Sequence, residues 1–204
     1  MTLSEFDNEI RKDHNVVCGC DEAGRGPLAG DVFAAAVKFG KDTGIEGIND
    51  SKKLTAKKRE ELFDEIMEKA VDFSIQTATV EEIEDINILN AAMLAMKRAV
   101  EDMDTKPDVC LIDGNKTPEG LECPAIAVVK GDAKSQAVAA ASILAKVARD
   151  RYMEQMAEQY PEYRFEKHKG YGTKLHYQMI DQYGPCGIHR MSFLKKYYAK
   201  KNGH

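Results

Sequence analysis

The chain is organised around one stretch near its N-terminus, Cys18-Gly19-Cys20-Asp21-Glu22-Ala23-Gly24-Arg25-Gly26-Pro27. Residues 16–20 are small, apolar or β-branched, which predicts a short buried strand with the carboxylates of Asp21 and Glu22 at its end. The Gly-Arg-Gly-Pro turn that follows can bring main-chain N–H groups close to a ligand. Two carboxylates this close repel each other unless one is protonated or a divalent cation neutralises both. Because the adjoining turn suits phosphate, we favour the cation.

Length and composition indicate one folded unit. The 204 residues suffice for one hydrophobic core, so we predict a single domain over residues 1–204. The first six residues lack the basic and apolar segments of a signal peptide, and the weakly polar stretch 137–145 is too short to span a bilayer. Five cysteines without a Cys-x-x-Cys pair favour neither a disulfide framework nor a zinc ribbon. We therefore expect a cytoplasmic protein with no membrane segment.

Charge is distributed unevenly along the chain. The net charge is −5, but residues 1–129 hold 15 Lys and Arg against 27 Asp and Glu, whereas residues 130–204 hold 14 against 7. A part with a net charge of +7 is basic enough to follow a phosphate backbone, although a solvated basic surface is the ordinary alternative. We predict that residues from about 160 to 204 form a basic, helical, substrate-binding part.

Hydrophobic periodicity predicts an α/β fold with a mixed five-stranded sheet flanked by helices. Apolar runs predict strands at 16–20, 32–39, 71–77, 109–112 and 124–129. Helical spacing predicts helices at 1–15, 55–70, 79–103, 135–159, 173–183 and 192–201, and we expect a basic loop at 160–172. The first two strands are expected to be antiparallel, and strands joined through helices parallel.

Four acidic residues from distant parts of the sequence are expected to meet at one edge of this sheet. Asp21 and Glu22 follow the first strand, Asp113 ends the fourth, and Asp132 is expected at the start of the helix after the fifth. Carboxyl ends of parallel strands meet at the same edge. Singly, each acid has an ordinary explanation: Asp113-Gly114 is typical of a tight turn, and Asp132 suits a helix N-terminus.

Oxygen ligands in this number suit Mg²⁺ or Mn²⁺. Two such ions roughly 4 Å apart can activate a water and stabilise the leaving oxygen at a phosphodiester, so the predicted reaction is phosphodiester hydrolysis. The sequence has no Walker lysine after Gly24 and no Ser-His-Asp arrangement that would favour covalent catalysis.

Further residues are candidates for substrate binding. The turn of Gly24, Arg25 and Gly26 can approach a ligand, and Ser51, Lys52 and Lys169 can contact phosphates, although solvated loops carry the same residue types. Tyr171 lies between glycines in a basic segment, where its ring can stack on a sugar or base; a packed turn tyrosine is the ordinary alternative.

Six spaced motifs together resemble ribonuclease HII. They are Cys20-Asp21-Glu22-Ala23-Gly24-Arg25-Gly26-Pro27-Leu28-Ala29-Gly30, Asn49-Asp50-Ser51-Lys52-Lys53-Leu54, Leu111-Ile112-Asp113-Gly114, Lys130-Gly131-Asp132, Ala139-Ala140-Ala141-Ser142-Ile143-Leu144-Ala145-Lys146 and His168-Lys169-Gly170-Tyr171-Gly172-Thr173. The resemblance runs in order from about residue 16 to residue 193. It departs from the family at Cys20, where a branched apolar residue is usual, and at Asp31, where proline is more usual.

The resemblance implies an RNase H-like sheet and a two-metal endonuclease that cuts the RNA strand of RNA/DNA hybrids. It also implies cutting on the 5′ side of single ribonucleotides embedded in duplex DNA, as in ribonucleotide excision repair, giving 3′-hydroxyl and 5′-phosphate ends. By position, Asp21, Glu22, Asp113 and Asp132 match the metal-binding acids of the family. Gly24-Arg25-Gly26 matches its 2′-hydroxyl-sensing loop, and Tyr171 matches its tyrosine at the RNA–DNA junction.

Two other interpretations and one partner stay open from the sequence. The chain could be a non-catalytic hybrid-binding protein with a structural metal, or a carboxylate–metal phosphatase. A monomer is expected. Met191, Leu194, Tyr197 and Tyr198 are spaced like a sliding-clamp peptide, but an ordinary amphipathic tail fits the same residues.

Overall fold

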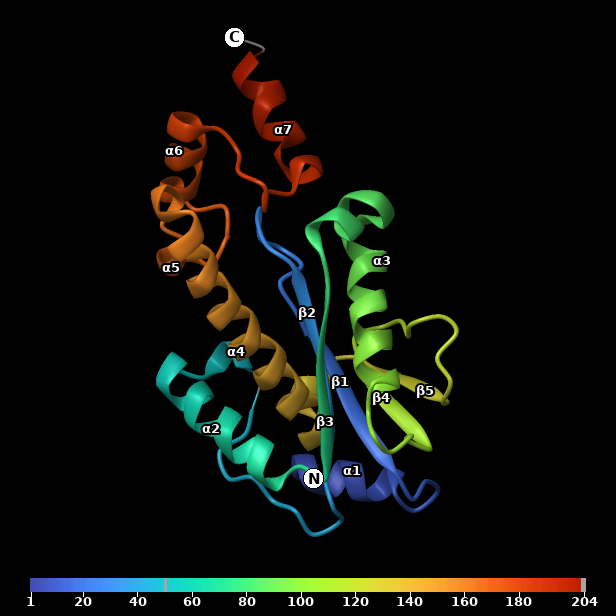
Figure 1. Cartoon of the computed structure of the whole chain (residues 1–204). Helices are drawn as coiled ribbons and strands as arrows, with labels where there is room; N and C mark the ends of the chain where they lie inside the picture. Colours follow the sequence, from blue (N-terminus) through green and yellow to red (C-terminus); the bar gives the residue numbers. More distant parts are fainter. Residues whose placement is uncertain (50, 203–204) are drawn as a thin grey trace.

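The computed structural model describes residues 1–49 and 51–202, with the side chains of Lys52 and Asn202 left out (Figure 1). The α-helices are α1 (Leu3–Ile10), α2 (Ala56–Lys69), α3 (Val80–Glu101), α4 (Gln136–Gln159), α5 (Phe165–His168), α6 (Lys174–Tyr183) and α7 (Met191–Asn202). The strands are β1 (Val17–Ala23), β2 (Val32–Lys38), β3 (Asp72–Ala78), β4 (Val109–Asp113) and β5 (Ala125–Val128). Short 3₁₀ turns lie at η1 (Ser51–Lys53), η2 (Gly131–Ala133) and η3 (Pro161–Tyr163). No helix in this part of the chain is long and apolar enough to cross a membrane.

The five strands form one mixed sheet in the order β3-β2-β1-β4-β5, as predicted. β1 pairs antiparallel with β2 and parallel with β4, and β4 pairs parallel with β5. The expectation that helix-linked strands lie parallel is wrong for β2 and β3, which are antiparallel although α2 connects them. The loop before α2 and α2 itself return the chain to the same end of the sheet at which β2 ended. Val71 N therefore donates to Lys38 O at 2.9 Å, and β3 starts beside the end of β2.

Helices cover both faces of the sheet (Figure 1). On one face, apolar residues of α3 such as Ala95 and Met96 pack against Cys18 and Cys20, which confirms the prediction that these cysteines are core residues. On the other face, α2 and the alanine-rich first half of α4 cover β2 and neighbouring strands. Alternate residues of each strand therefore face different helices, as the period of a strand requires.

Helix α4 approaches β1 closely because β1 has a glycine at the contact. A Cβ on Gly19 would lie 2.3 Å from main-chain atoms of both Ala137 and Val138. Asp7 of α1 fixes the same end of α4, since its Oδ2 accepts a 2.9 Å hydrogen bond from Ala137 N. These contacts set the height of α4 over the sheet, and thus where Ser142 falls.

Two predicted helix starts are confirmed in atomic detail. Thr79 caps α3 in a capping box with Glu82, and Ser135 caps α4 through the N–H of Val138. The basic loop predicted at 160–172 is wrong in part, because η3 and the single turn α5 form within it. The helices α5, α6 and α7 lie together beyond the end of the sheet at which β1 turns into β2 (Figure 1).

Candidate active site

The end of β1 differs from the prediction in a way that matters for the site. The strand continues through Asp21 and Glu22 to Ala23, where the sequence suggested an end at Cys20. Successive side chains of a strand point to opposite faces of the sheet. Asp21 and Glu22 therefore diverge, although they are adjacent in sequence.

Asp21 and Asp113 are neighbours across the sheet. The parallel register pairs Cys20 with Ile112, so these two aspartates follow at adjacent positions on adjacent strands. Both lie on the face covered by α4, since Ile112 and Cys20 face α3. The long separation of Asp21 and Asp113 in sequence is thus closed by strand pairing, as predicted.

Asp21 is a buried carboxylate among like charges. Its side chain is 4% exposed, and its Oδ1 accepts a 2.7 Å hydrogen bond from Glu22 N. Burial raises the pKa of Asp21 well above its usual range, the charges of Glu22 and Asp113 raise it further, and the hydrogen bonds from Glu22 N and Ser142 oppose this. A charge held this way favours either a proton or a cation.

Asp113 links the sheet to the segment that carries Asp132. Its Oδ1 accepts a 2.6 Å hydrogen bond from Gly131 N, and a Cβ on Gly131 would lie 3.3 Å from the same oxygen. Asp132 is the next residue and is buried at 8% exposure. It lies in η2 and not at the start of α4, which corrects its predicted place while keeping it beside Asp113.

Glu22 forms an ion pair of its own. Its carboxylate forms a 3.1 Å ion pair with Arg25, three residues further along. Among the residues described, no three His, Cys, Asp or Glu side chains stand at the spacing of a metal-ligand set. The structure thus brings Asp21, Asp113 and the segment of Asp132 to one edge of the sheet. Main-chain N–H groups donate to the carboxylates of Asp21 and Asp113.

Most of the predicted substrate-binding residues surround one pocket of about 200 Å³ beside these acids. Its lining is formed by Glu22, Ala23, Gly24, Arg25, Gly26, Ser51, Ser142, Lys146 and Tyr171. Tyr171 is 43% exposed at its rim, and a Cβ on Gly26 would lie 3.7 Å from its ring. Lys169 does not line this pocket, and its amine is paired with Glu154 at 2.7 Å. The side chain of Lys52 lies outside the described residues, as does Asp50.

Ser142 and Lys146 are site residues that sequence reasoning did not select. Ser142 Oγ lies 2.8 Å from Ser51 Oγ, and Lys146 is paired with Asp150. The two are four residues apart on α4 and therefore share a face of the helix. This spacing, inside the motif 139–146, was the available signal.

The segment of Tyr171 is held by a pair of buried histidines. His176 Nδ1 lies 3.0 Å from Tyr171 O, and His176 Nε2 lies 3.0 Å from His189 Nε2. Cys186 N donates to His189 Nδ1 at 2.9 Å, which assigns the proton of His189 to Nε2 and that of His176 to Nδ1. Burial lowers the pKa of both histidines to about 4, so both are neutral at pH 7.

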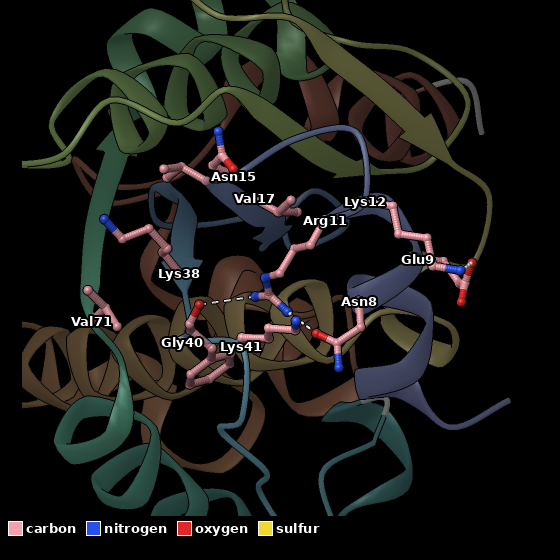
Figure 2. Close-up of a pocket in the computed structure, with 12 residues that line it drawn as sticks. Asn8, Glu9, Arg11, Lys12, Asn15, Val17, Lys38, Gly40, Lys41 and Val71 are labelled. Carbon is pink, nitrogen blue, oxygen red and sulfur yellow. Dashed lines mark hydrogen bonds and ion pairs between the residues drawn. The ribbon is translucent and has the colours of Figure 1, made fainter.

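A larger cavity lies elsewhere, where β1 begins and β2 ends (Figure 2). Its volume is about 600 Å³, and its basic residues are Arg11, Lys12, Lys38 and Lys41. Arg11 spans it with hydrogen bonds to Asn8 Oδ1 and Phe39 O. None of the predicted site residues lines it, so size does not mark the site here.

Comparisons with known proteins decide the family. A profile described as Ribonuclease HII matches residues 18–196. A ribonuclease HII of Caldicellulosiruptor saccharolyticus is 53% identical over 189 residues, which cover 93% of this chain and 92% of that protein. The chain belongs to the ribonuclease HII family. This membership confirms the predicted enzyme class, an endoribonuclease of the RNase H type that acts on RNA/DNA hybrids.

Solved structures agree with the fold. The ribonuclease H2 of Pyrococcus horikoshii is 30% identical, with a TM-score of 0.71, over 87% of this chain and 93% of that one. A ribonuclease HII of Archaeoglobus fulgidus, solved as a complex with PCNA, is 25% identical, with a TM-score of 0.67, over 86% and 94% of the two chains. The predicted RNase H-like sheet is therefore confirmed.

Proposed function

We propose that this ribonuclease HII is a Mg²⁺- or Mn²⁺-dependent endonuclease that cuts beside a ribonucleotide paired in a duplex. Its substrates would be the RNA strand of RNA/DNA hybrids and single ribonucleotides embedded in duplex DNA, cut on their 5′ side to leave 3′-hydroxyl and 5′-phosphate ends. The observation that carries the proposal is the pair of Asp21, which is buried, and Asp113, which is half-buried, on adjacent strand ends beside the pocket of Gly24 and Tyr171.

The acids fit a divalent cation in chemistry and in electrostatics. Asp21 is buried next to two further carboxylates, and this arrangement becomes favourable when a cation neutralises it. Asp21 and Asp113 would be the central ligands, with Asp132 and Glu22 completing two sites once Glu22 releases Arg25. Two bound ions supply charge neutralisation at the phosphodiester and a more acidic water.

The residues around the pocket would recognise the sugar and the strand. The main-chain N–H groups of Arg25 and Gly26 are suited to the ribose 2′-hydroxyl, the group that distinguishes RNA from DNA. The exposed ring of Tyr171 would stack on the sugar at the junction. Ser51, Lys52 and Lys169 would contact phosphates, although the pairing of Lys169 with Glu154 must open for this.

We further propose that residues 1–204 act as one RNase H-like domain, monomeric and cytoplasmic, whose basic part at 160–204 follows the duplex backbone. A sliding-clamp contact through α7 has less support. Leu194, one of the four residues with clamp-peptide spacing, is fully buried against Leu28 and Ile180, so it contributes to the core and is not displayed. An amphipathic tail explains α7 better.

The test compares three duplexes of one sequence: one with a single ribonucleotide, one of DNA only, and one RNA/DNA hybrid. Each is incubated with and without Mg²⁺ or Mn²⁺, and the ends are mapped. We expect divalent-dependent cutting of the first and third, 5′ to the ribonucleotide. Binding without product would favour the hybrid-binding protein, and turnover of a free phosphomonoester that is indifferent to salt would favour the phosphatase.

A further inference from the structure

Arg190 is a fully buried arginine just before α7, and it contacts the loop that follows β1. Its Nε donates to Gly30 O at 2.8 Å, and its Nη1 donates to Arg25 O and Pro27 O at 3.1 and 2.9 Å. Its Nη2 donates to Gly24 O and Gly30 O at 2.7 and 2.6 Å. A guanidinium has five N–H donors, so every one is used, and all of them on carbonyls of this loop.

This convergence fixes the direction of the opposite groups. In a trans peptide, the N–H of one residue points away from the carbonyl of the residue before it. With the carbonyls of Gly24 and Arg25 turned toward Arg190, the N–H groups of Arg25 and Gly26 point to the other side of the loop. The peptide between Pro27 and Leu28 shows the same geometry. Pro27 O faces Arg190, and Leu28 N donates on the other side to Gly170 O at 2.8 Å, next to Tyr171.

Arg190 does not line the pocket, so the N–H groups of Arg25 and Gly26, which point away from Arg190, lie on the pocket side of the loop. Arg25 and Gly26 line the pocket together with Tyr171 and Ser142. Within the part of the chain that the structure describes, neither N–H donates to a protein acceptor. Two main-chain donors beside a polar pocket are therefore available to a ligand oxygen.

The main chain near Arg190 continues the same connection. Arg190 N donates to Leu28 O, and Gly30 N donates to Ile188 O, both at 2.8 Å. The positive charge of Arg149 disfavours the charged form of the Arg190 guanidinium, and the negative charge of Asp31 favours it. The guanidinium is thus stabilised mainly by carbonyl oxygens, which lysine, with its three donors on a flexible stem, cannot satisfy in the same fork geometry.

We propose that Arg190 is a positioning residue for sugar discrimination, because it holds the main chain of residues 24–30 in the conformation that turns the N–H groups of Arg25 and Gly26 toward the ribose. The inference rests on the proposed function. It assigns the specificity for the 2′-hydroxyl to a side chain 160 or more residues away in sequence that does not itself contact the substrate. It also places the start of α7 in direct contact with the sugar-reading loop.

The test measures discrimination in binding. Dissociation constants for the single-ribonucleotide duplex and the all-DNA duplex are measured with Mg²⁺ for Arg190→Lys, in an Asp113→Asn background that prevents cutting. We expect the ratio of the all-DNA dissociation constant to the ribonucleotide-duplex dissociation constant to fall by about 10-fold, which corresponds to the loss of one or two hydrogen bonds. Affinity for the all-DNA duplex should stay unchanged. Arg98→Lys is the matched control, since Arg98 makes three hydrogen bonds, to Thr77 and Glu82, away from this loop.

An unchanged ratio, or an equal loss of affinity for both duplexes, would overturn the inference. If the Asp113→Asn protein with an intact Arg190 already fails to discriminate, the proposed function fails instead. Hydrogen exchange on the wild-type protein tests the geometry without any variant. The amides of Arg25 and Gly26 should exchange fast in the free protein and be protected by the ribonucleotide duplex only; slow exchange in the free protein would contradict the assigned orientation.

Discussion

The molecule holds two clusters of like charge within one region, and they differ in how their hydrogen bonds are satisfied. Arg149 and Arg190 are buried at 1% and 0% exposure, and both donate to main-chain carbonyls that converge on them. Asp21 and Asp113 are also close together, but the main-chain donors that face their carboxylates are the N–H groups of Glu22 and Gly131. Arg190 uses all five of its N–H donors on carbonyls and Arg149 makes three such bonds, whereas each carboxylate has more acceptor positions than the donors that face it.

This difference separates a scaffold from a site. A guanidinium that uses all its donors on carbonyls holds the main chain and needs no ligand. A carboxylate has about four acceptor positions, and one main-chain donor leaves most of them open at an edge where burial and then like charge raise the pKa of Asp21. We infer that the arginines set the shape of the loop, and the proposed function assigns a divalent cation to the acids.

The largest expected effect comes from the acid cluster. Asp113→Asn keeps the shape of the side chain and removes one negative charge, so cutting of the single-ribonucleotide duplex should fall about 10³-fold or more, since metal charge stabilisation is worth several kcal/mol. Binding of the duplex should persist. The exposed Asp104→Asn is the control and should cut normally. A wild-type rate for Asp113→Asn would remove this residue from the mechanism.

A substitution at Gly24 should disturb the arginine cluster. Gly24 has a φ of +101°, and a Cβ there would lie 2.1 Å from Arg149 Nε, so Gly24→Ala should lower the free energy of unfolding by about 2–4 kcal/mol. Gly26→Ala, with 3.7 Å to the Tyr171 ring, should cost far less. Urea unfolding measures both. Equal stabilities would show that Arg149 does not support the loop.

The histidine pair is a further internally satisfied cluster, and it predicts a pH dependence. The folded pKa of His176 and His189, about 4, lies below the unfolded value, so the unfolded state binds more protons between about pH 6.5 and 4. Stability should therefore fall as the pH falls through this window, by roughly 3 kcal/mol for each histidine by pH 4. The fall should be smaller in His176→Asn and unaltered in His14→Asn. Identical curves for the wild type and His176→Asn would contradict the assignment.

The smallest expected effect has the opposite sign to most substitutions. Asp21→Asn removes a carboxylate whose pKa is raised by burial and by its charged neighbours, so in a chelator at pH 7 the variant should be more stable than the wild type by about 1 kcal/mol. Thermal unfolding measures this. A less stable variant would mean that Asp21 stabilises the fold by itself, as a structural acid does.

Local signals predicted most of the fold. The capping box at Thr79 and the alternation in 71–77 each depend on residues a few positions apart, and both are confirmed. The pairing of Asp21 with Asp113 also followed, since strand ends meet at one edge. The end of β1 was predicted too early, because Gly-Arg-Gly is a turn signal. Asp21 and Glu22 in fact remain in the strand and point to opposite faces.

The supporting residues of the site could not be predicted from the sequence. Arg190 and the loop it holds are about 160 residues apart, and no local pattern distinguishes a buried arginine from a surface one. The histidine pair depends in the same way on the packing of α6 beside residues 184–190. Sequence reasoning selected candidate chemical groups and missed the residues that orient them, because orientation depends on long-range contacts.

Cation binding by the acid cluster is tested most directly by calorimetric titration of the full chain with MnCl₂ in the absence of nucleic acid, wild type against Asp21→Asn, with Asp104→Asn as the surface control. The account predicts saturable binding by the wild type and the control, and its loss in Asp21→Asn. Equal Mn²⁺ binding by all three proteins would contradict the claim that Asp21 and its neighbours hold the ion.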